Sequence, residues 1–160
     1  MREKILALLE RNARMDVHEL AILIGTDDIT VANELAEMEK AKVICGYHTM
    51  VNWENTTREI VTALIEVKVT PQRGIGFDKL AEQIYNFPEV DDLYLMSGAF
   101  DFTVIIEGKS MREVAGFVSE KLSTIDAVMS TATHFVLKKY KLHGTVLVKP
   151  VRDERIMVTP

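Results

Sequence analysis

The chain lacks several features that define common protein classes. It has one cysteine among 160 residues, which excludes an internal disulfide framework. Cys45 lies in an apolar stretch and is expected to be a buried, inert thiol. No run of eighteen apolar residues is present, so no membrane span is expected. The start, Met1 to Lys4, is followed by no small-residue cleavage site, which argues against a signal peptide and makes the cytoplasm the default location.

The chain also lacks the residue constellations of a metal site or an active site. Its four histidines are scattered, and no Cys/His spacing suits zinc. No nucleophile stands beside a recognisable base, so no catalysis is predicted and no cofactor is expected.

Helical spacing predominates in the first forty residues. Apolar residues recur every three or four positions over 2–12, and Asp16 with Glu19 forms a variant of the capping box before a second helix. Gly25 marks a turn, and Asp27 is the expected cap of a third helix that ends near Ala41. This pattern predicts a helix-turn-helix whose third helix would enter a major groove of DNA. The β-rich residues 43–51 are predicted to form a short wing or hairpin.

The charge of this segment conflicts with its spacing. Residues 1–55 hold six Lys or Arg and ten Asp or Glu, a net charge of −4, whereas residues 56–160 carry only −1. Between positions 27 and 42 there are five acids and two bases. Affinity for DNA comes largely from Lys and Arg that neutralise phosphates. Two interpretations therefore stay open for the third helix: a DNA reader, or an acidic surface that is a structural relic or contacts a protein.

The spacing of apolar residues changes after a polar linker, from the helical period alone to a mixture of strand-like and helical segments. Strand-like runs cover 60–69, 90–96, 102–106 and 129–140, and helical stripes cover 77–85 and 111–122. The order β-α-β-β-α-β predicts a ferredoxin-like domain, a four-stranded antiparallel sheet with two helices on one face. The fold class is therefore α+β, with a winged helix-turn-helix at 1–52, a linker at 53–59, the ferredoxin-like domain at 60–142 and an extension at 143–160. Apolar residues on both faces of the last strand favour burial of both faces, hence a homo-oligomer. For the extension, the apolar residues Val146 to Val148 are compatible with a further short strand, followed by a tail that is either ordered or swapped.

Three stretches carry a family resemblance. They are the Leu20-Ala21 to Tyr47 spacing, the Gly98-x-x-Asp101 loop between predicted strands, and Thr131-Ala132-Thr133 leading into Phe135. Together they resemble the Lrp/AsnC family of leucine-responsive, or feast/famine, regulators over nearly the whole chain. The resemblance implies a dimer through paired sheets that assembles into tetramers, octamers or larger rings. It also implies a small effector, typically an amino acid, bound between dimers in the C-terminal domain.

The resemblance implies an effector site at Gly98, Ala99, Asp101, Thr131 and Thr133. An α-amino group favours a carboxylate, and a carboxylate ligand favours hydroxyls and the backbone N–H groups that a glycine turn exposes. In many relatives the position after Gly98 is polar or charged, but here it is Ala99. The alternative is a plain turn whose Asp101 caps a strand end, with the two threonines packed in a strand.

On the third helix, Thr30 and Asn33 are candidates to read bases, because Asn can pair with adenine in the major groove. Many members carry Arg or Lys just before the position of Leu35, but here it is Glu34. Arg11 is a further candidate for phosphate contact. The candidate DNA-binding residues are Thr30, Asn33, Glu34, Lys40, Lys42, Arg14 and His48.

The sequence thus predicts a sequence-specific DNA-binding transcriptional regulator that senses an amino acid or a related effector. The alternative is an amino-acid-sensing oligomer that acts through a protein partner and binds DNA weakly or not at all.

Overall fold

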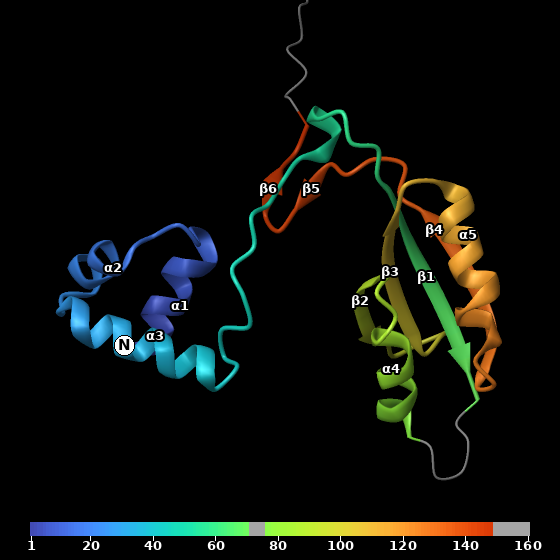
Figure 1. The fold of residues 1–160 in the computed structure, drawn as a ribbon, viewed down its shortest axis with the longest axis horizontal. Coiled ribbons are helices and arrows are strands. Elements are labelled where there is room, and N and C mark those ends of the chain that lie inside the picture. The colour runs from blue at the N-terminus through green and yellow to red at the C-terminus, as the bar shows by residue number, and fades with distance from the viewer. Residues whose placement is uncertain (71–75, 149–160) are drawn as a thin grey trace, which may run out of the picture. The chain divides into compact units, whose positions relative to one another are not determined.

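The structure is a computed structural model that describes residues 1–70 and 76–148. The chain divides into two compact units, Met1–Val51 and Asn52–Pro160, drawn in Figure 1. Residues 53–59, predicted as a linker, fall in the second unit, and much of the predicted extension, 149–160, lies outside the described residues. Within the described part of the chain, no helix is long and apolar enough to cross a membrane.

Three helices make up the first unit: α1 (Arg2–Arg11), α2 (Val17–Ile24) and α3 (Asp28–Lys40). The predicted capping box before α2 is confirmed, because the Asp16 carboxylate accepts the Glu19 N–H and the Glu19 side chain accepts the Asp16 N–H. These caps satisfy backbone donors that a helix start leaves unpaired. The fully packed core residues of this unit are Ile5, Leu9, Leu20, Ala21, Val31 and Met38.

The prediction of a wing at 43–51 is wrong, because these residues form no strand. Lys42 adopts a left-handed backbone with φ 57°, and the N–H groups of Val43 and Ile44 both bond to the Met38 carbonyl. The chain therefore closes the end of α3 and lays Ile44 against the core. An isolated two-stranded hairpin gains too little burial to be stable by itself. Cys45, predicted to be buried, is exposed.

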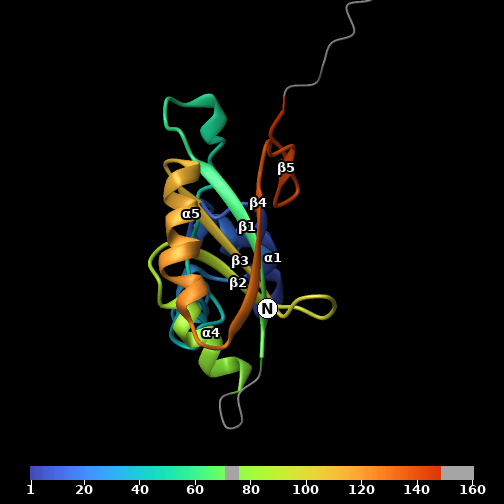
Figure 2. The ribbon, with the colours of Figure 1, turned by 90° about the vertical axis from the view of Figure 1, so that its right-hand side faces the viewer.

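The second unit confirms the ferredoxin-like order. Its main elements are β1 (Val61–Val69), α4 (Phe77–Tyr85), β2 (Val90–Leu95), β3 (Phe102–Gly108), α5 (Met111–Glu120) and β4 (Val128–Phe135). All strand pairs are antiparallel, in the order β2-β3-β1-β4. Figure 2 shows α4 and α5 on the same side of this sheet. Short 3-10 turns lie at Trp53–Asn55 and Leu122–Thr124.

Strand β4 is shorter than predicted. It ends at Phe135, and the Val136 N–H makes the last bond across, to the Thr62 carbonyl. Because β1 begins at Val61, the chain beyond this point has no strand of the four-stranded sheet to pair with among residues 1–70 and 76–148. It forms a small hairpin instead, in which β5 (Lys141–Leu142) pairs with β6 (Thr145–Val146). A side-chain hydrogen bond links the end of this hairpin to the start of the unit, because Asn52 Nδ2 donates to the Leu147 carbonyl 2.9 Å away.

The core of the second unit lies between the sheet and the two helices. Alternate residues of β1 and β3 point into it, as the period-2 pattern requires, and Phe77 of α4 packs edge-on against Phe102 at 5.9 Å. The intervening residues face away from the helices and include Leu64 and Ile105, which pair directly. We call this second surface the open face. The buried core residues are Ala63, Ile65, Val67, Val69, Leu80, Ile84, Phe102, Val104, Ile106, Val114, Phe117 and Leu122.

Candidate DNA-binding helix and effector loop

The turn between α2 and α3 depends on Gly25. Its φ of 82° is left-handed, and its N–H and that of Thr26 both bond to the Ala21 carbonyl. Glycine adopts this conformation without the steric cost that other residues incur. Two residues later, Asp27 caps α3 by accepting the Thr30 N–H at 2.9 Å. The turn therefore fixes α3 as a separate helix directly after α2, as a helix-turn-helix requires.

One side of α3 is buried and the other is exposed. Val31 and Met38 are fully buried, whereas Ile29 on the opposite side is 75% exposed. With 3.6 residues per turn, four further exposed residues align with Ile29. We call this set the outward stripe; it consists of Ile29, Ala32, Asn33, Ala36 and Lys40. It contains no carboxylate, two small alanines that permit close approach, one amide and one cation.

Two acids of α3 are bound by one residue of α1. The Nε of Arg2 donates to Glu34, and its Nη2 donates to Glu37. The hydrogen bond to Glu34, followed by its charge, raises the pKa of Arg2. Glu34 is therefore held against α1 rather than presented for base contact, although its position was predicted to be one that contacts DNA.

The other two acids of α3 also have partners outside the helix. Both oxygens of Asp28 lie 3.1 Å from Nδ1 of His18 on α2. The Tyr47 hydroxyl donates to Glu39 at 2.8 Å, and burial, then this hydrogen bond, raises the pKa of Tyr47. All four carboxylates of α3 thus contact donors at the sides of the helix, which explains how an acidic helix presents a stripe without carboxylates.

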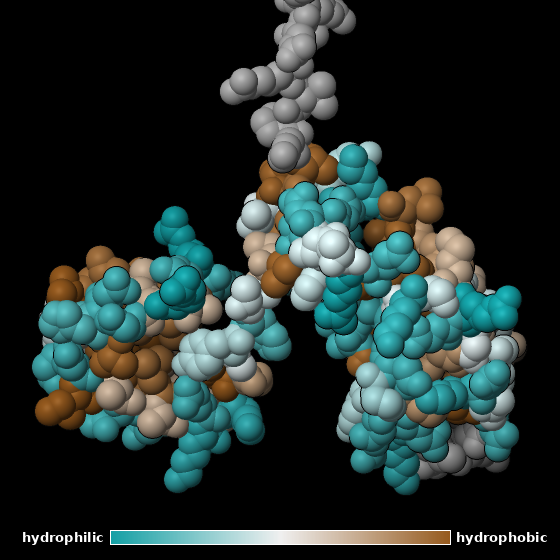
Figure 3. Space-filling view, turned by 45° about the horizontal axis from the view of Figure 1, so that its top comes forward, coloured by the Kyte–Doolittle hydropathy of each residue, from teal (hydrophilic) through white to brown (hydrophobic). Residues whose placement is uncertain are grey.

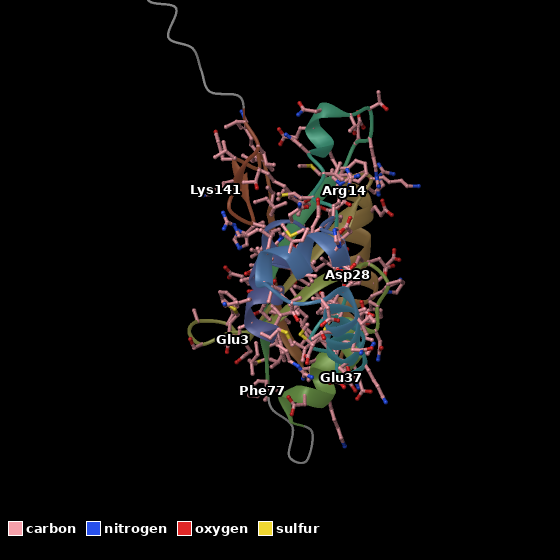
Figure 4. The ribbon with its side chains drawn as sticks, turned by 90° about the vertical axis from the view of Figure 1, so that its left-hand side faces the viewer. Glu3, Arg14, Asp28, Glu37, Phe77 and Lys141 are labelled. Carbon is pink, nitrogen blue, oxygen red and sulfur yellow. The ribbon has the colours of Figure 1, made fainter. Side chains whose placement is uncertain are left out.

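The structure separates the predicted DNA-binding residues. Asn33 and Lys40 share the outward stripe, but the Thr30 hydroxyl donates to Asp27 at 2.6 Å and lowers the pKa of that carboxyl. Lys42 follows the end of α3, and His48 lies in the segment after it. Figure 4 shows Arg14 well away from Glu37. Sequence reasoning missed Ile29, Ala32 and Ala36; a helical projection about the buried pair Val31 and Met38 would have found them.

The loop between β2 and β3 is held by backbone hydrogen bonds. The Met96 N–H bonds to the Asp101 carbonyl at 2.8 Å, and the Asp101 N–H bonds to Val67 at 3.0 Å. The carboxylate of Asp101 accepts the Val69 N–H at 2.8 Å. Gly98 has a φ of 132°, which favours glycine. Asp101 therefore caps the end of β1, and the loop projects from the side of the sheet opposite to α4 and α5 (Figure 2).

Thr131 and Thr133 do not join this loop within one chain. They pair with Val67 and Ile65, whose side chains are buried under the helices. Directly opposed residues of antiparallel strands share a face, so both threonines face the helix side and are half-buried. Asp101 and Thr131 lie on opposite flanks of β1, about two strand spacings or ~10 Å apart. The structure thus brings together Gly98, Ala99 and Asp101, but not the threonines.

A helix-turn-helix unit followed by a ferredoxin-like unit with an exposed loop defines a two-part regulator, one part for DNA and one for a ligand. The model of the Lrp/AsnC ligand binding domain matches residues 62–146. The chain is 49% identical to the uncharacterized HTH-type transcriptional regulator YugG of Bacillus subtilis, over 98% of this chain and 95% of that one. The chain belongs to the Lrp/AsnC family of transcriptional regulators, and its relatives are regulators rather than enzymes.

More distant relatives agree with this assignment. The proline dehydrogenase transcriptional activator of Rhodobacter capsulatus is 28% identical over 84% of this chain and 87% of its own. Among solved structures, AsnC of Escherichia coli aligns with a TM-score of 0.68 at 22% identity, covering 92% of this chain and 96% of that one. A regulator of Neisseria meningitidis in complex with L-Met aligns with a TM-score of 0.70 at 22% identity, covering 88% and 90%. At these identities the structures support the shared fold.

Proposed function

We propose that the chain is a sequence-specific transcriptional regulator that reads DNA with the outward stripe of α3. The observation that carries this proposal is the absence of carboxylates from the stripe, since all four acids of α3 contact other groups of the first unit. Asn33 can hydrogen-bond adenine, and alanine can contact the methyl group of thymine. Lys40 stands at the end of the stripe, where it can reach a phosphate.

Fluorescence anisotropy with a DNA fragment from the chain's own promoter tests this function. Asn33→Ala is expected to change the preference among base sequences. Lys40→Ala is expected to weaken all sequences alike and to reduce the salt dependence by about one phosphate contact. Glu120→Gln, an exposed change in the second unit, serves as the control. No binding by the unmodified chain at low salt, with or without amino acids, would refute the DNA-binding function.

For the effector, the proposal is an amino acid bound at the loop of Gly98, Ala99 and Asp101. The L-Met complex of the Neisseria relative supports the ligand class. Oδ2 of Asp101 is engaged by Val69, but among the described residues Oδ1 accepts no hydrogen bond and remains able to receive an amino group. A thermal-shift screen of the twenty amino acids tests this, because a ligand at a hundred times its Kd stabilises by about 2.7 kcal/mol. A shift that persists unchanged in Ala99→Glu would place the ligand elsewhere.

For assembly, the proposal is a homo-oligomer through the open face of the sheet. Among the described residues of the second unit, no helix covers this face, and Leu64, Ile105 and Tyr94 contribute apolar area to it. Ile105→Glu is expected to reduce the molar mass measured by light scattering, because it would bury an unpaired charge between two sheets. An unchanged mass would exclude this face as the interface.

A second candidate function is action through a protein partner, which the apolar surface of α2 favours. Ile22 and Leu23 are 66% and 60% exposed, and Figure 3 shows apolar side chains interrupting the hydrophilic surface of the first unit. If the chain fails to bind DNA but captures a protein, and Ile22→Ser with Leu23→Ser abolishes that capture, this function replaces the first.

A further inference from the structure

We propose that Arg2 is a positioning residue for DNA reading, which acts by holding and neutralising Glu34 and Glu37 beside the outward stripe. This role rests on the proposed DNA-binding function and deepens it. It assigns a task to Arg2, which lies more than thirty positions before the two glutamates that it contacts.

The geometry shows one guanidinium shared by two carboxylates. Nε and Nη2 are separate donors of the same planar group, and each contacts a different glutamate one helical turn apart on α3. The side chain of Glu34 is 23% exposed and that of Glu37 is 67% exposed. A guanidinium presents several N–H donors in a fixed fork, whereas a lysine ammonium is a single point charge. The arrangement therefore requires arginine in particular.

The position of Glu37 explains why this contact concerns DNA. Glu37 lies four residues after Asn33 and three before Lys40, so it adjoins both on the helix surface. An uncompensated carboxylate there lies within the screening length of about 10 Å at 0.1 M salt, and it would repel an approaching phosphate. It would also be free to pair with Lys40 and to withdraw that cation from DNA.

Arg2 differs from the other partners of the helix. Tyr47 is a neutral donor, and His18 carries a charge only when it is protonated. The first unit is described completely, and within it Arg2 is the one Lys or Arg that pairs with α3. The permanent positive charge that other elements of the first unit place against Glu34 and Glu37 therefore comes from this single side chain.

Four full-length proteins test the proposal: the unmodified chain, Arg2→Ala, Glu34→Gln with Glu37→Gln, and all three changes combined. Anisotropy with the promoter fragment over a range of salt concentrations gives their affinities. Arg2→Ala is expected to weaken binding about tenfold at low salt. The triple variant is expected to bind at least as tightly as the unmodified chain, because the carboxylates that Arg2 compensates are gone. A triple variant as weak as Arg2→Ala would overturn the proposal, since Arg2 would then contact phosphate itself.

Two controls separate this role from folding and from the proposed function. In thermal unfolding, Arg2→Ala should lower the midpoint in the native background but not when both glutamates are glutamines; equal effects in both backgrounds would overturn the pairing without reference to DNA. Arg2→Lys keeps the positive charge but lacks the planar set of guanidinium donors, so its affinity for DNA should lie between those of Arg2→Ala and the unmodified chain. If the unmodified chain binds DNA and Arg2→Ala binds equally well, this role alone fails. If the unmodified chain does not bind at low salt, the proposed function fails with it.

Discussion

The two units hold their candidate sites in different ways. In the first unit, surface side chains control the charge around α3, as when Arg2 binds Glu34 and Glu37. In the second unit, the Gly98 loop is fixed by backbone groups of Met96, Asp101 and Val67. Surface pairs are weakened by salt, whereas backbone bonds at a sheet end are not. We therefore expect DNA reading to respond to charge and the loop to respond to backbone geometry.

The largest expected effect concerns the core, where the units also differ. The described part of the second unit buries twelve hydrophobic residues in one cluster, and the first unit buries six. A cavity in the larger core is therefore expected to cost more stability. Phe102→Ala should lower the free energy of unfolding by about 3–5 kcal/mol. Tyr85→Ala, at a residue 55% exposed on α4, should change it by no more than about 0.5 kcal/mol. Guanidinium denaturation followed by circular dichroism measures both, and similar losses would show that Phe102 is not a core residue.

Replacing a glycine by alanine is expected to have a smaller effect on stability, and the sign of that effect should differ between the two units. Gly25→Ala should destabilise the first unit by roughly 1–2 kcal/mol, because φ 82° is left-handed. Gly116→Ala should stabilise the second by about 0.5–1 kcal/mol, because Gly116 lies inside α5 and an added methyl group would meet nothing within 4 Å. Thermal unfolding of the two variants gives the signs. A stabilised Gly25→Ala would mean that the turn between α2 and α3 is not left-handed in solution.

The sequence predicts best what neighbouring residues determine. The capping box of Asp16 and Glu19, the turn at Gly25 and the order of strands and helices follow from short-range patterns. The wing was wrong because β-rich residues alone do not supply a pairing partner. The end of β4 was misplaced for the same reason, since the start of β1 at Val61 sets where pairing stops.

The candidate sites were predicted only in part. The net acidity of α3 suggested poor DNA binding, because no local pattern links Arg2 to Glu34 across more than thirty residues. Asn33 and Lys40 do share the exposed side of the helix. In the second unit the loop residues Gly98 and Asp101 were identifiable, but the face of Thr131 depends on its register with Val67, which the sequence does not contain.

The smallest expected effect is a pH dependence confined to the second unit, at Glu107. Burial would raise the pKa of Glu107, but hydrogen bonds from Lys139 and Thr62 outweigh it and lower the pKa. A carboxyl with a lowered folded pKa stabilises the protein above its unfolded pKa of about 4.3, and this contribution is lost as the pH falls through the folded value. Glu107→Gln should therefore flatten the decline in stability below about pH 4.3.

The pKa of Asp91, a neighbour of Glu107, is shifted in the opposite direction, which makes the pH dependence of Glu107→Gln more specific. Burial, then the charge of Glu107, raises the pKa of Asp91, so its contribution increases as the pH falls from the raised folded pKa to the unfolded one. Glu107→Gln removes that charge and should lower the pKa of Asp91. The slopes of stability against pH that Glu107 and Asp91 cause should therefore both become shallower. Urea denaturation at a series of pH values, with Glu120→Gln as a matched control, measures the change. A steeper acid decline in Glu107→Gln would show that its contacts with Lys139 and Thr62 do not stabilise the ionised form.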